Sequence, residues 1–151
     1  MKPLLISAIL AAALGGCAFG GSPRPKAPKS YLTEADRISA ESQALSSLAI
    51  FEAAVASYAK DNSSPPARLE DLVPVYLSVI PVLDLGLEIH PLTMETRTYA
   101  PEILKDGAPN PASLRDSGRW GYIAGPKPLI FIDCTHQSSR LKPWYLERGV
   151  F

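Results

Sequence analysis

The clearest pattern in the chain is a series of large apolar residues at helical spacing between residues 33 and 60. Successive members lie three, four or seven positions apart, which places them on one face of an α-helix. Thr33 is a favourable N-cap residue, and Asp36 lies where a capping-box acid would lie. The pattern predicts a long helix from Thr33 to about Lys60, whose core face consists of Ile38, Leu45, Leu48, Phe51, Val55 and Tyr58.

The pattern changes after the helix to short stretches in which apolar and polar residues alternate, as in half-buried strands. A turn at 125–127 joins the last two stretches as a hairpin, whereas 101–118 forms a polar loop. The tail 141–151 either adds an edge strand or packs its aromatic residues on the sheet. The sequence therefore predicts an α+β fold, in which a long N-terminal helix packs on a small antiparallel sheet. The predicted strands are 87–90, 95–100, 119–123 and 128–135.

The N-terminus has the three-part pattern of a secretory signal. One lysine precedes an apolar run, and small residues then lead into Cys17 in the sequence MKPLLISAILAAALGGC. This pattern resembles the bacterial lipoprotein signal, which is cleaved just before a cysteine that becomes lipid-modified. It predicts a signal peptide over 1–16 and a lipid attachment site at Cys17. An ordinary signal peptide with an incidental cysteine is the alternative.

The resemblance to a lipoprotein signal also implies a location and a domain plan. Position 18 is alanine rather than the aspartate typical of inner-membrane retention, so we expect an outer-membrane lipoprotein that faces the periplasm. Residues 17–32 are rich in glycine, proline and lysine and predict a flexible tether. Residues 33–151 then form a single α+β domain, as the length of 151 residues suggests.

Composition narrows the expected partners. The 15 basic and 15 acidic residues balance, which argues against a nucleic-acid-binding surface. The sequence has no glycine-rich phosphate loop and no Ser/His/Asp arrangement. We therefore expect no cofactor, and no small-molecule substrate is identified. The membrane, reached through the lipid on Cys17, is the one partner that these patterns indicate. Lipidation of Cys17 leaves Cys134 as the remaining thiol, so no intrachain disulfide is expected.

The sequence DCTH, residues 133–136, is the most evident candidate for catalysis. In a regular strand, Cys134 and His136 share one face and Asp133 points to the other. Asp133 and His136 then cannot pair, and Cys134 reaches His136 only if the strand bends. We therefore expect Cys134 to be a small buried apolar residue, and we expect no catalytic site. A ligand-binding or hydrolytic lipoprotein that uses Cys134 and His136 is the alternative function.

Metal ligands are also sparse along the chain. His90, His136 and one free thiol lack the close spacing of zinc motifs. The 101–118 loop offers oxygen donors at Asp106, Asn110 and Asp116, but their spacing matches no calcium-binding motif. The sequence thus predicts no metal site, and these loop residues are expected to be solvated turn residues.

Two segments resemble the soluble head domain of type IV pilin-like proteins, in particular the pseudopilins of type II secretion systems. They are FEAAVASYAKDNSSPPARLEDLVPVYLSVIP at 51–81 and RWGYIAGPKPLIFIDCTH at 119–136, and the resemblance covers roughly residues 40–136. It implies that Phe51 and Tyr58 lie under the sheet and that Trp120 and Tyr122 share one strand face. A helix and a hairpin of this kind also suit other small α+β domains.

The N-terminus departs from that family. Pilins and pseudopilins begin with a prepilin-peptidase site and a long apolar helix that polymerises, whereas this chain has a lipoprotein signal and a tether. The resemblance therefore implies a lipid-anchored, non-enzymatic envelope protein. We expect it to be an interaction or structural component associated with type II secretion or type IV pilus-like machinery. The alanine- and serine-rich faces of the long helix are either a partner surface or simply solvated.

Overall fold

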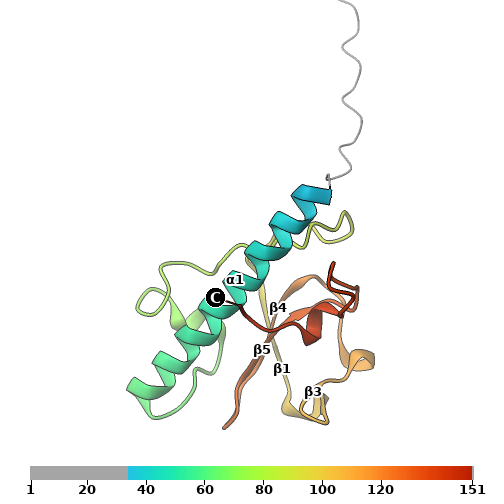
Figure 1. Ribbon diagram of the computed structural model, residues 1–151. Helices are drawn as coiled ribbons and strands as arrows, with labels where there is room; N and C mark the ends of the chain where they lie inside the picture. The colour runs from blue at the N-terminus through green and yellow to red at the C-terminus, as the bar shows by residue number, and fades with distance from the viewer. Residues whose placement is uncertain (1–33, 151) are drawn as a thin grey trace, which may run out of the picture. The chain divides into compact units, whose positions relative to one another are not determined.

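One long helix and a small mixed sheet form the domain in the computed structural model, which describes residues 34–150 (Figure 1). Helix α1 spans Glu34–Asn62. The sheet has the strand order β1-β4-β5, with β1 at Thr96–Tyr99, β4 at Arg119–Ile123 and β5 at Leu129–Asp133. The predicted α+β class with a long helix is confirmed for these residues.

The prediction of an antiparallel sheet is only partly correct. Strands β4 and β5 form the expected antiparallel hairpin, but β1 runs parallel to β4. Parallel neighbours need a connection that carries the chain back across the sheet. Residues 100–118 provide that connection between β1 and β4. The segment predicted as a polar loop is therefore the crossover that makes the pairing of these two strands parallel.

The apolar face predicted for α1 is largely the buried face. Leu45, Leu48, Phe51 and Val55 are buried, and Tyr58 is partly buried against the same core. Ile38 is the exception, because half of its surface is exposed. None of residues 34–39 is buried, so the first turns of α1 lie outside the core that the rest of the helix covers.

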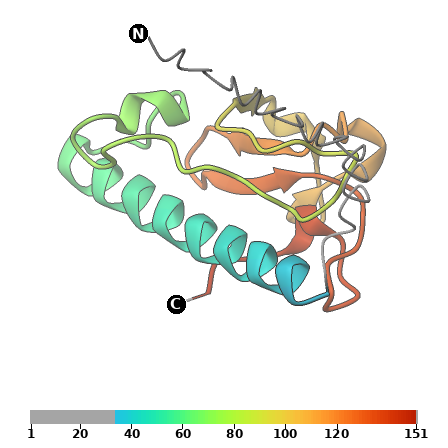
Figure 2. The same cartoon turned by 90° about the horizontal axis from the view of Figure 1, so that it is seen from above.

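The sheet lies against α1 (Figure 2). Aromatic residues of β4 belong to the core that the two share. The ring of Phe51 meets that of Trp120 edge-on at a centroid distance of 5.0 Å. Trp120 Nε1 donates a hydrogen bond to the carbonyl of Pro81 at 2.8 Å, and Tyr122 Oη donates to the carbonyl of Pro66 at 2.8 Å. These bonds satisfy the polar atoms of two fully buried rings. Phe51, Trp120 and Tyr122 therefore lie where the sequence predicts.

A second, smaller core covers the opposite face of the sheet. Tyr99, Ile123 and Phe131 are buried there. The Phe131 ring lies over Gly121, where an added Cβ would come within 2.5 Å of it. Within 101–118, β2 at Leu104–Lys105 pairs with β3 at Ala108–Pro109, between 3-10 turns at Pro101–Ile103 and Pro111–Ser113. The apolar residues of this segment cover the second face, namely Ile103, Leu104 and Leu114.

Two further segments differ from the expected strands. Residues 87–90 form a turn closed by a 3.0 Å hydrogen bond from the His90 N–H to the Leu87 carbonyl, so the predicted strand there is wrong. The tail packs instead of adding a strand: it forms a 3-10 turn, η4, at Trp144–Leu146, and Trp144 is buried in the core shared with α1. The predicted signal peptide, Cys17 and the tether lie outside the described residues. No helix within 34–150 is long and apolar enough to cross a membrane.

Candidate functional site at the end of β5

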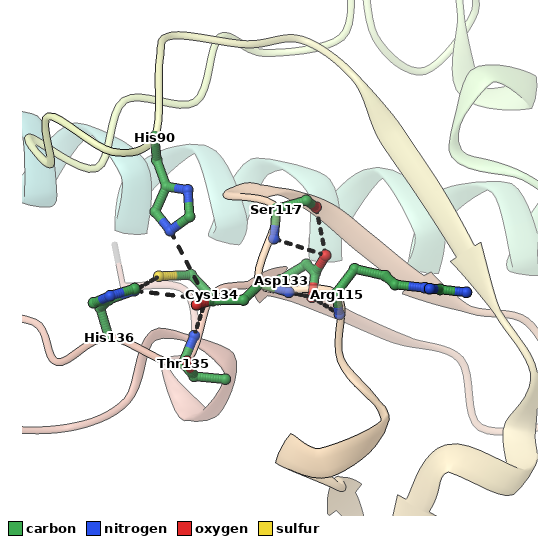
Figure 3. A network of polar contacts seen from close by, with 8 residues as sticks. His90, Arg115, Ser117, Asp133, Cys134, Thr135 and His136 are labelled. Carbon is green, nitrogen blue, oxygen red and sulfur yellow. Dashed lines mark hydrogen bonds and ion pairs between the residues drawn. The ribbon is translucent and has the colours of Figure 1, made fainter.

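Four side chains capable of binding a metal converge beside the last residue of β5. They are His90, Asp116, Cys134 and His136, and one potential ligand atom from each lies within 4.8 Å of all the others. His90 comes from the turn before β1, and Cys134 and His136 come from the chain after β5 (Figure 3). Asp116 comes from the loop before β4. The fold therefore joins residues that are far apart in the sequence.

The chain bends directly after β5. The Cys134 N–H donates to the Ile132 carbonyl at 2.8 Å, and the carbonyls of Cys134 and His136 accept from the backbone N–H groups of Tyr145 and Trp144. This bend brings Cys134 Sγ to 3.5 Å from His136 Nδ1, the approach that a regular strand does not allow. Cys134 is nevertheless fully buried beside Ile132, which confirms its expected place in the core.

Asp133 shapes the neighbouring loop. Its buried carboxylate accepts hydrogen bonds from the backbone N–H groups of Arg115, Asp116 and Ser117 at 3.2 Å each, and from the Ser117 hydroxyl (Figure 3). Three consecutive N–H groups bound to one carboxylate fix the local backbone. Asp133 thus points toward the 115–117 loop rather than toward His136, as strand alternation predicts.

Asp116 is presented by this loop in a left-handed backbone conformation, with φ of +53°. Its Oδ1 accepts a 2.7 Å hydrogen bond from the Thr135 N–H and lies 3.8 Å from His90 Nε2 and 3.6 Å from His136 Nδ1. Burial by itself raises the pKa of Asp116. The hydrogen bond from Thr135 and the two imidazoles outweigh burial and hold that pKa below its ordinary value. A carboxylate is therefore favoured at the centre of the cluster.

The backbone of Gly118 packs closely against the His90 side chain. A Cβ at position 118 would lie 2.5 Å from the imidazole, which is too close for any side chain. The backbone there also has a φ of +67°, which favours glycine, so space and conformation both require this residue. The His90 ring meets the His136 ring edge-on at 5.4 Å. Sequence reasoning missed Gly118, for which the turn-forming run Asp116-Ser117-Gly118 was the available signal.

The electrostatic environment argues against an activated cysteine. Burial raises the pKa of Cys134 to about 12, so the protonated thiol dominates at neutral pH. Nucleophilic cysteines are thiolates in electropositive, accessible surroundings. Cys134 has neither the surface access nor the lowered pKa of such a residue.

The two other oxygen donors proposed for the 101–118 loop have structural roles. Asp106 is exposed in the turn between β2 and β3, with φ of +53°. The Asn110 side chain caps the following 3-10 turn by accepting a 3.2 Å hydrogen bond from the Ala112 N–H. Both behave as turn residues, as the sequence predicts, and among the three donors only Asp116 belongs to the cluster.

The chain matches no known family profile, no curated protein and no solved structure.

Proposed function

We propose that this chain is a lipid-anchored, non-enzymatic, pilin-like envelope protein. Its role is that of an interaction or structural component, associated with type II secretion or type IV pilus-like machinery. The arrangement of the domain carries the proposal: α1 lies across the sheet with Phe51 against Trp120, as expected from the resemblance of the segments 51–81 and 119–136 to pseudopilin heads. The lipoprotein-like signal ending at Cys17 supports the outer-membrane, periplasm-facing anchor.

Exposed apolar residues in the segment 75–94 support an interaction role. Val79 and Met94 help to line a hollow of about 440 Å³ on the protein surface. A bridge between Leu83 and Thr93 holds the middle of this segment beside its C-terminal end. Contiguous exposed apolar patches on soluble proteins commonly mark interaction sites. The large apolar side chains of this segment that are about half exposed or more are Val75, Val79, Val82, Ile89, Leu92 and Met94.

The short distance between Cys134 Sγ and His136 Nδ1 favours the alternative, a hydrolytic or ligand-binding lipoprotein. The burial of Cys134 and the high pKa of its thiol count against it. A native thiol that reacts rapidly with iodoacetamide at neutral pH would favour the alternative, whereas an unreactive thiol removes it.

Replacing Cys17 with serine should release the protein from the membrane, because the lipid is the proposed anchor. We expect wild type to incorporate radiolabelled palmitate and to sediment with outer membranes, and the Cys17→Ser variant to do neither. Cys134→Ala, which changes the other cysteine, is the control and should fractionate like wild type. Membrane association that survives Cys17→Ser would refute the anchor.

Affinity purification of the full chain from solubilised, cross-linked envelopes tests the proposed partners. We expect secretion or pilus components to be recovered with wild type, and about tenfold less with Val79→Ser combined with Leu92→Ser, since each substitution removes apolar contact area. Leu141→Ser is the control, because Leu141 is more exposed than Val79 and Leu92 but lies outside the 75–94 segment. If wild type recovers no secretion or pilus component, the association with that machinery is wrong.

A further inference from the structure

We propose that His90, Asp116, Cys134 and His136 form a structural zinc site. The proposal concerns the stability of the domain and does not depend on the function proposed above.

The distances between the four groups approach those of a tetrahedral zinc centre. Zinc–ligand bonds of about 2.0 to 2.3 Å place neighbouring ligand atoms about 3.3 to 3.6 Å apart. The observed contacts are 3.5 Å for Cys134 Sγ to His136 Nδ1, 3.6 Å for Asp116 Oδ1 to His136 Nδ1, and 3.8 Å for Asp116 Oδ1 to His90 Nε2. All the ligand atoms lie within 4.8 Å of one another, so small movements of the more exposed Asp116 and His136 would complete the tetrahedron.

His90 supplies an independent sign that a ligand belongs here. Its side chain is 93% buried, since only 7% is exposed, and its Nε2 faces the cluster without a hydrogen-bond partner among the described residues. A buried polar atom without a partner is destabilising. The contact with Asp116 at 3.8 Å is too long to be a hydrogen bond. A zinc ion between His90 Nε2 and Asp116 Oδ1 would be a binding partner for both atoms.

Metal binding fixes the protonation states of the imidazole and thiol ligands. A neutral imidazole has the lone pair that a metal requires. The buried Cys134 thiol would release its proton to solvent when its sulfur binds the ion, because the thiolate is the metal ligand.

The four side chains offer two imidazole nitrogens, one sulfur and one carboxylate oxygen, a ligand set that favours zinc. Sulfur and imidazole ligands suit zinc and are not ligands of calcium or magnesium, which take oxygen. Four protein ligands fill a tetrahedral coordination sphere, which is typical of structural rather than catalytic zinc. The ion would fasten three separate segments together: the 87–90 turn, the 115–117 loop and the chain after β5.

The surrounding hydrogen bonds hold the ligands in position, as the outer shell of a metal site does. Asp133 fixes the loop that presents Asp116, and the Thr135 N–H orients the Asp116 carboxylate. Backbone hydrogen bonds from Tyr145 and Trp144 fix the bend that carries Cys134 and His136. The site is thus organised before an ion arrives.

Metal titration of the full chain tests the proposal. The protein is purified with Cys17→Ser, which removes the proposed lipid anchor and leaves Cys134 as the remaining cysteine. It is then stripped with EDTA and dialysed against buffered zinc. We expect one zinc ion per chain and a higher midpoint of thermal unfolding with zinc. Cobalt should give the charge-transfer absorption of a cobalt–thiolate bond, which Cys134→Ala abolishes. His136→Ala removes a ligand whose side chain is 42% exposed, and it should weaken zinc binding about 100-fold or more while leaving the zinc-free fold intact.

Asp106→Asn is the matched control, because Asp106 is an exposed acid of the same loop region and lies outside the cluster. It should bind zinc as tightly as the parent protein. Binding of less than one equivalent at micromolar free zinc would overturn the proposal. Wild-type affinity in both Cys134→Ala and His136→Ala would also overturn it, and folding of each variant is verified by circular dichroism.

Discussion

Replacing Asp133 with asparagine should lower the free energy of unfolding by about 3 to 5 kcal/mol, because an acceptor-only carboxylate is exchanged for an amide in a buried site. Asp133 is fully buried and accepts four hydrogen bonds from Arg115, Asp116 and Ser117. An amide nitrogen in place of one oxygen would face these donors with another donor. Chemical denaturation followed by circular dichroism measures the loss.

The same substitution at Asp106 is the control for Asp133→Asn. Asp106 is exposed in a turn with positive φ, a conformation that asparagine also tolerates, so we expect a change within about 0.5 kcal/mol. A loss below about 1 kcal/mol in Asp133→Asn would show that the carboxylate does not organise the 115–117 loop.

Phe51→Ala should lower the free energy of unfolding by about 3 to 5 kcal/mol, the usual cost of truncating a buried aromatic side chain. Phe51 is fully buried in α1 and its ring contacts that of Trp120 edge-on, so the substitution leaves a cavity between helix and sheet. Urea denaturation monitored by tryptophan fluorescence measures the stability, and the emission reports on the environment of the two buried tryptophans, Trp120 and Trp144.

Ile50→Ala provides the comparison for Phe51→Ala. Ile50 is the preceding residue of the same helix, but 47% of its surface is exposed, so its truncation should cost less than about 1 kcal/mol. Equal losses of unfolding free energy in Phe51→Ala and Ile50→Ala would mean that α1 does not pack on the sheet through the face that carries Phe51.

The sequence predicts those parts of the fold that follow from local periodicity. The long helix and the β4–β5 hairpin both have a strong repeat over adjacent residues, and both are present. The parallel pairing of β1 with β4 and the turn at 87–90 were not predicted. Both depend on how the connecting segments cross the sheet, and alternation over four residues contains no information about that path.

The candidate site was missed for a related reason. Zinc motifs are recognised from ligands close together in sequence, whereas here His90, Asp116 and Cys134 lie on three separate segments. Strand alternation correctly turned Asp133 away from His136. It could not foresee the bend after β5, because the hydrogen bonds that stabilise the bend come from Trp144 and Tyr145 in the tail.

The close packing of Gly149 on Ala49 limits how α1 can meet another helix. A Cβ at position 149 would overlap the helix backbone at Ala49, and Ala49 is fully buried. The tail thus covers Ala49, a small residue of α1 at which another helix could otherwise pack closely. A competing helix would first have to displace the tail and break the contact of the Val150 N–H with the Leu45 carbonyl. A partner that leaves the tail in place has to approach α1 along its exposed strip, where Ile50 and Ala53 lie.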